Sequence, residues 1–126
     1  STLGSLVPAR LLDTRTGSQT VDGQLAGIGV RPAGSVTSVP VLGRGGVPAN
    51  ATAVVLNVTA VQAVSNGYLS VYPCGEAVPN ASNVNYTAGQ TVPNAVVAKV
   101  GSGGQICVFA EQPTGLLVDV NGYVVP

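Results

Sequence analysis

Short apolar runs alternate with turn signals along the whole chain. Ser65-Asn66-Gly67 and the glycine-rich segment 101–104 each mark a tight hairpin, because Asn and Gly accept positive φ angles. No segment keeps the spacing of three to four residues that marks an amphipathic helix. The pattern is typical of a single all-β domain over residues 1–126, a β-sandwich of jelly-roll or Ig-like topology with about eight strands. Strands are expected over residues 9–13, 35–41, 52–61, 67–72, 83–86, 95–100, 105–109 and 116–124, and a long loop over 14–34.

The C-terminal segment LLVDVNGYV carries an acid and an amide inside an apolar run. Side chains alternate between the two faces of a strand. Strict alternation puts Asp119 and Asn121 on one face together with Leu117 and Tyr123. The apolar stripe on the other face then consists of Leu116, Val118, Val120 and Val124. In residues 52–61 one face is apolar and the other is half apolar, which predicts a central strand covered on much of both faces.

Composition narrows the classes of partner. The chain is 45% hydrophobic and only 8% charged, against about 25% charged residues in an average soluble protein. Five basic and five acidic side chains cancel, so no basic patch is expected to bind nucleic acid or an anionic membrane. Residues 45–75 carry no charge, but the prolines and asparagines among them exclude a membrane-spanning helix. The opening STLGS has neither a basic start nor an apolar core, so it is not expected to be a signal peptide.

The absence of histidine removes most catalytic chemistry. No Ser-His-Asp or Cys-His arrangement and no histidine-containing zinc site can form. Paired carboxylates, as in glycoside hydrolases, would be the remaining route, but a small chain poor in aromatic residues predicts no sugar-gripping cleft. We therefore expect no enzyme activity, no catalytic residue and no cofactor. The GRGG segment at 43–46 lacks the GK[ST] ending of a phosphate loop and is expected to be a turn.

Two interpretations of the polar residues near the ends of the chain remain open. Arg10 and Arg15 flank Asp13, and a buried carboxylate is usually matched by arginine in forked hydrogen bonds. If the first and last strands are neighbours, a structural polar network would fix their register, formed by Arg10, Asp13, Arg15, Asp119 and Asn121. The weaker interpretation is a calcium site, to which Asp13, Asp119 and Asn121 would contribute oxygen ligands.

Three segments together resemble a known family. PARLLDTR (8–15), VPANATAVVLNVTAV (47–61) and LLVDVNGYV (116–124) are similar to segments of a poorly characterised all-β module of secreted actinobacterial proteins. GYLSVYPCG and SNVNY, which lie between them, also have counterparts in that module. The module is found appended to secreted hydrolases or in tandem on large surface proteins, so the resemblance implies a secreted or cell-surface accessory role. It carries over no catalytic residue.

The two cysteines, Cys74 and Cys107, lie in separate strand-like segments. They would be either two buried thiols or one disulfide. The composition and the resemblance both indicate a location outside the cell, and this favours the disulfide.

Two functions compete. The first is assembly or adhesion at the cell surface, in which uncharged β edges such as AVVLNV are buried against copies of the chain or neighbouring domains. The apolar N-terminal STLGSLVPA would then add as a strand to a partner. The second is polysaccharide binding in support of a secreted hydrolase, with contacts from Tyr68, Tyr72, Asn83, Asn85 and Tyr86. Exposed, coplanar tyrosines would favour sugar binding, and buried tyrosines would remove its best support.

Overall fold

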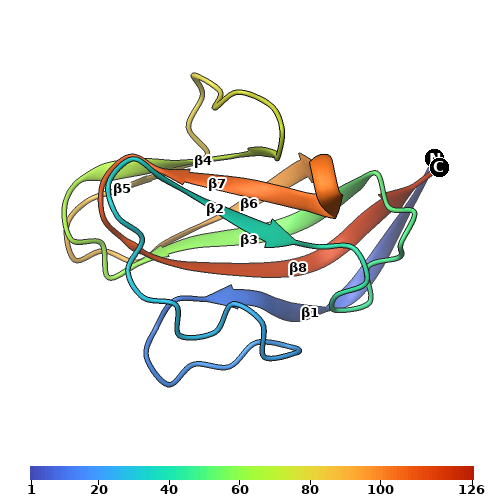
Figure 1. The fold of residues 1–126 in the computed structure, drawn as a ribbon, viewed down its shortest axis with the longest axis horizontal. Helices are drawn as coiled ribbons and strands as arrows, with labels where there is room; N and C mark the ends of the chain where they lie inside the picture. Colours follow the sequence, from blue (N-terminus) through green and yellow to red (C-terminus); the bar gives the residue numbers. More distant parts are fainter.

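Eight strands form two four-stranded antiparallel sheets in a computed structural model that describes residues 1–126 (Figure 1). The strands are β1 (Thr2–Asp13), β2 (Ser35–Pro40), β3 (Ala53–Val61), β4 (Gly67–Pro73), β5 (Val84–Tyr86), β6 (Val92–Lys99), β7 (Gln105–Ala110) and β8 (Gly115–Val125), with a single 3₁₀ turn, η1 (Ser102–Gly104), before β7. One sheet has the order β1-β8-β3-β6 and the other β2-β7-β4-β5. The predicted all-β sandwich is confirmed. The structure has no helix that could span a lipid bilayer.

The strand order decides between the jelly-roll and the Ig-like topology, which the sequence leaves open. Strands that follow one another along the chain lie in opposite sheets at most steps, and each sheet combines early and late strands. Two interlocked Greek keys of eight strands in two sheets define a jelly roll. The fold is therefore a jelly roll and not an Ig-like sandwich.

The core lies between the two sheets. It is a cluster of 23 buried residues to which every strand contributes. Leu56 and Val58 of β3 and Val118 of β8 are fully buried, because both strands occupy central positions in their sheet. The sequence correctly predicts that β3 is central, so the AVVLNV segment does not form a free edge.

The first strand is longer than the sequence predicts. It begins at Thr2 and not at residue 9, and its N-terminal half pairs with the end of β8. Pro8 makes this half of β1 hard to recognise as a strand from the sequence, because proline usually ends a strand. Here it lies in an irregular segment between Ser5 and Ala9, where the register with β8 shifts and no partner needs a Pro8 N–H. The N-terminal segment is therefore an edge strand of the chain's own sheet, paired on one side with β8.

A β-bulge changes the alternation in β8. Val55 of β3 pairs with Gly122, whereas the next residue, Leu56, pairs with Val120, so Asn121 has no partner on β3. One extra residue reverses which face the following side chains occupy. Tyr123, which pairs with Val54, accordingly packs against the core. The prediction that Val124 belongs to the core stripe is wrong, because that prediction assumed strict alternation through Asn121.

Cys74 and Cys107 form a disulfide between the end of β4 and the neighbouring strand β7. Cys74 also begins the loop 74–83, which stands over β4 in Figure 1. The loop is tied down at its far end, because the Ser70 hydroxyl donates to the carbonyl of Ala81 and the Val71 N–H donates to the Asn83 side chain. The disulfide therefore anchors a segment that covers the outer face of β4.

Removal of the disulfide in a Cys74→Ser, Cys107→Ser double variant should lower the free energy of unfolding by about 3–4 kcal/mol. The bridge closes a loop with a sequence separation of 33, and opening it restores that conformational entropy to the unfolded chain. Urea denaturation followed by circular dichroism measures the loss. Reduction of the wild type should give the same loss, and a double variant as stable as the oxidised wild type would contradict the prediction.

Candidate functional site

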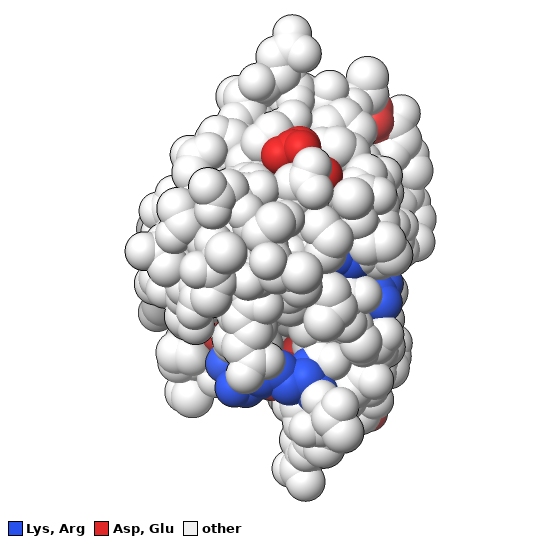
Figure 2. All heavy atoms as spheres, turned by 90° about the vertical axis from the view of Figure 1, so that its left-hand side faces the viewer, with Lys and Arg blue, Asp and Glu red and all other residues white.

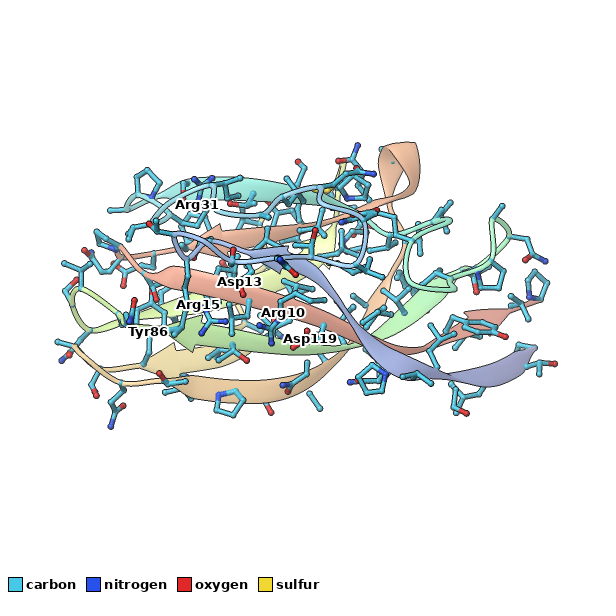
Figure 3. The ribbon with its side chains drawn as sticks, turned by 90° about the horizontal axis from the view of Figure 1, so that it is seen from below. Arg10, Asp13, Arg15, Arg31, Tyr86 and Asp119 are labelled. Atoms are coloured by element: carbon cyan, nitrogen blue, oxygen red, sulfur yellow. A yellow bond between two sulfur atoms is a disulfide. The ribbon has the colours of Figure 1, made fainter.

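A row of four alternating charges runs from β8 through β1 into the loop that follows β1 (Figure 3). Asp119 of β8 accepts from Nε and Nη2 of Arg10, at 2.9 and 3.2 Å. Nη1 of the same arginine reaches Asp13 at 3.0 Å. Asp13 then accepts from Nε and Nη2 of Arg15, at 3.0 and 2.8 Å. The structure thus joins four of the five residues of the expected polar network across the β1–β8 pair.

The local chain path explains why Asp13 stays ionised although its side chain is only 2% exposed. It ends β1, and the chain turns so that both the backbone N–H and the guanidinium of Arg15 donate to it. The Arg15 side chain lowers the pKa of Asp13 most, ahead of the opposing effect of burial. The Asp119 carboxylate in turn raises the pKa of Arg10. The two pKa shifts favour the charged forms of the Asp13 carboxylate and the Arg10 guanidinium.

Asn121 does not belong to this network. Its position in the bulge removes its pairing with β3, and its side chain makes no hydrogen bond. The carboxylate oxygens of Asp13 and Asp119 accept arginine hydrogen bonds, so these two side chains act as arginine partners. No group of three or more acidic or cysteine side chains gathers elsewhere. The structure therefore supplies no oxygen cluster from the calcium candidates.

Sequence reasoning missed a second arginine site. Arg44, in the turn formed by GRGG, is buried and donates from Nε and Nη2 to the Asp22 carboxylate, both at 2.8 Å. It also donates to the carbonyls of Pro40, Leu11 and Gln24. The Arg44 side chain lowers the pKa of Asp22 to about 2. Since Leu11 and Pro40 belong to different sheets, this one side chain ties together β1, the end of β2 and the loop 14–34.

The residues expected to contact a glycan do not form one exposed platform. Tyr86 is buried in the core, where its hydroxyl donates to the Gln112 carbonyl at 2.7 Å and burial raises its pKa. Tyr72 is buried as well, although it faces away from the core, because the loop 74–83 folds back over β4. Asn83 is engaged with the Val71 N–H. Tyr68 of β4 and Asn85 of β5 are cross-strand neighbours, and both remain accessible to solvent. Tyr68 packs against Phe109.

The structure contains one pocket, which no sequence pattern indicates. It has a volume of about 400 Å³ and lies where β1 and β3 end and β8 begins. Its lining consists of Thr14, Arg15, Thr16, Gly29, Val30, Gln62 and Gly115. These residues come from four separate parts of the chain, so no motif marks them. The pocket includes Arg15, the last member of the charge row.

Comparison with known proteins adds no assignment. No protein-family model matches the chain, and no curated protein matches it.

Asp13→Asn should destabilise the protein by about 3 kcal/mol, and Asp119→Asn should cost clearly less. Asp13 is buried between two arginines, and its loss leaves Arg10 and Arg15 without their shared anion. Asp119 is more exposed and pairs with one arginine only. Urea denaturation at pH 7 measures both values, and equal losses would contradict the ranking.

Acid should unfold the protein through Asp13 and Asp22. Both carboxyl groups have a lowered pKa in the folded state, so the unfolded chain binds more protons at low pH. The free energy of unfolding should be constant from about pH 7 to 5 and should fall as the pH drops from about 4 towards 2. Denaturation at a series of pH values measures this slope.

Asp22→Asn is the variant that tests the slope, with Glu76→Gln as its control. Asp22→Asn should be less stable at pH 7 and should lose less stability on acidification, because the Arg44 pair is already broken. The Glu76 side chain makes no ion pair, so Glu76→Gln should keep the wild-type slope. An unchanged slope in Asp22→Asn would show that this pair does not drive acid unfolding.

Proposed function

We propose that this chain is a non-catalytic extracellular structural or adhesion module that packs against a second copy of itself. The observation that carries the proposal is an uncharged apolar surface at the end of the sandwich where both termini lie side by side (Figure 1). We call it the terminal face and define it as Leu3, Ala53, Val55, Val97 and Val124 on the outer side of the β1-β8-β3-β6 sheet.

The register of the sheet makes the terminal face continuous. Leu3 pairs with Val124, which pairs with Ala53, so one apolar row crosses three strands. In the next row, Val55 pairs with Val97 of β6 and with Gly122, which has no side chain to interrupt the surface. Leu3 and Val97 are each 70% exposed. Contiguous exposed apolar surface of this kind marks interaction sites in soluble proteins.

The adjoining edge of the sheet is also unprotected. β1 is an edge strand, and residues 2–9 contain no charged side chain. The loop 14–34 pairs with β1 only from Arg10 onward, so the outer edge of its N-terminal half is free. Val7 on this edge is 87% exposed. Natural β proteins usually guard such an edge with lysine, inward charge or a covering segment.

A second copy fits this surface by its chemistry. The chain has no net charge, and Lys99 is the only charged side chain that pairs with a member of the terminal face. Two such faces meet without electrostatic repulsion, and an apolar surface is complementary to itself across a two-fold axis. Apart from Lys99, a charged partner would find no complementary group there.

The extracellular part of the proposal rests on two supports. The Cys74–Cys107 disulfide is typical of proteins from oxidising compartments. The segments 8–15, 47–61 and 116–124 resemble a module of secreted actinobacterial proteins, and the polar residues in two of them, Asp13 and Asp119, hold arginines. That use of the acids supports a structural role and not a catalytic one.

The purified chain should form discrete oligomers or filaments as its concentration rises into the high micromolar range. Light scattering over a concentration series and electron microscopy of the same samples measure this. A Leu3→Lys, Val97→Lys double variant should weaken association at least about tenfold, because it places two charges on the terminal face.

Val36→Lys is the matched control, because Val36 is an exposed strand valine on the other sheet. It should associate like the wild type. A wild type that stays strictly monomeric at about 1 mM would overturn the proposal. Loss of association in Val36→Lys alone would keep assembly but move the contact to the other sheet.

A further inference from the structure

The pocket has the size and the chemistry of a small polar ligand site. Its volume of about 400 Å³ lies within the usual range of ligand pockets, roughly 300–1,000 Å³. Val30 is the only hydrophobic residue in its lining, and no acidic residue lines it. A ligand that fits must therefore be polar, and it meets hydrogen-bond donors without meeting a repelling carboxylate.

Arg15 gives the pocket its charge. In the row Asp119–Arg10–Asp13–Arg15 each inner member has two partners of opposite charge, whereas Arg15, at the end, has one. Its Nε and Nη2 are used by Asp13, and its Nη1 has no acceptor in the protein. Its side chain is 44% exposed. The pocket thus lies at the positive end of an alternating row, where an oxyanion gains a charge-assisted hydrogen bond.

Gln62 supplies a second, independent sign of a site. It follows β3 directly and has a φ of 51°, in the left-handed region that normally favours glycine. Its side-chain amide makes no hydrogen bond within the protein and borders the pocket. Strained residues of this kind cluster where a backbone is held in place for ligand contact. The amide offers both a donor and an acceptor in the lining that also contains Arg15.

Hydrogen bonds fix the part of the lining formed by Thr14, Gly29 and Gly115. Arg31, labelled in Figure 3, donates to the carbonyls of Ile28 and Gly29, and the Gly29 N–H donates to the Thr14 carbonyl. The Thr14 hydroxyl accepts from the Leu116 N–H at 2.9 Å, which fixes the floor next to Gly115. These contacts fix the Thr14 and Gly29 parts of the lining before a ligand binds.

We propose that this pocket binds a sugar acid, with the ligand carboxylate on Arg15 and its hydroxyl groups on Gln62 and Thr16. The carboxylate matches the free guanidinium N–H, and the ring hydroxyls need the mixed donors and acceptors of an amide and a hydroxyl. The end of the molecule that holds the pocket faces the viewer in Figure 2. There the basic groups gather in the lower half of an otherwise mostly uncharged surface. This site lies at the opposite end of the sandwich from the terminal face, so it does not depend on the proposed self-association.

Titration with D-glucuronate, followed by NMR chemical shifts of the full chain, tests the proposal. Saturable shifts are expected, with a dissociation constant in the millimolar range, and D-glucose should bind at least about tenfold more weakly because it lacks the carboxylate. Acetate separates the carboxylate contribution from that of the ring, and it too should bind more weakly than D-glucuronate.

Gln62→Gly is the most informative variant, because glycine accepts the positive φ and the fold should be retained. It should weaken D-glucuronate binding at least about fivefold. Arg15→Gln should abolish the preference for D-glucuronate over D-glucose. Lys99→Gln removes a positive charge at the other end of the sandwich and should leave binding unchanged.

Four results would overturn the proposal. The first two are no saturable shift with D-glucuronate and equal affinity for D-glucuronate and D-glucose. The others are equal weakening by Lys99→Gln and Gln62→Gly, and shifts that saturate but map to residues outside the pocket. If Arg15→Gln proves too unstable to study, Gln62→Gly with the D-glucose comparison decides the matter.

Discussion

A carboxylate buried at the end of a strand must be compensated, and much of this structure follows from how Asp13 is compensated. An unpaired buried charge costs several kcal/mol, which is a large fraction of the stability of a domain of this size. Three sets of donors remove that cost: the Arg15 backbone, the Arg15 side chain and Arg10. The first two force the chain to turn directly after β1. The third connects β1 to Asp119 of β8, so one acid sets the register of the edge strand and the path of the loop behind it.

The loop 14–34 has little core of its own and depends on these arginine contacts. Asp13 pairs with this loop through its backbone, since its N–H donates to the Leu25 carbonyl and its own carbonyl accepts from Gly27. Arg44 holds the loop from the other side through Asp22, and it also bridges the two sheets through Leu11 and Pro40. In a chain with only 8% charged residues, the ion pairs are therefore concentrated where a long irregular segment must be fixed.

The sequence predicts the parts of the fold that depend on short-range pattern. Each of the eight predicted strands has a counterpart in the structure, because burial of one face per strand leaves a visible period, but the N-terminal half of β1 is missing from the prediction. The bulges at Leu11 and Asn121 are invisible to that reasoning, since a bulge is decided by the register of two paired strands. The pairing of Asp13 with the arginines could be anticipated because they are close in the sequence. Arg44 could not be, since its partner Asp22 lies 22 residues away in a loop without pattern.

The concentration of charge also divides the molecule into two unlike ends. The Arg15 end has the pocket, the strained Gln62 and the positive end of the charge row. The end that carries the termini has exposed valine and leucine, with Lys99 as the one charged side chain paired beside them. Since the rigid strands of one sandwich separate the two ends, contact at one need not obstruct the other. A module built in this way could join copies through its terminal face while its pocket stays open to solvent. For this reason, substitutions that abolish association should leave D-glucuronate binding intact.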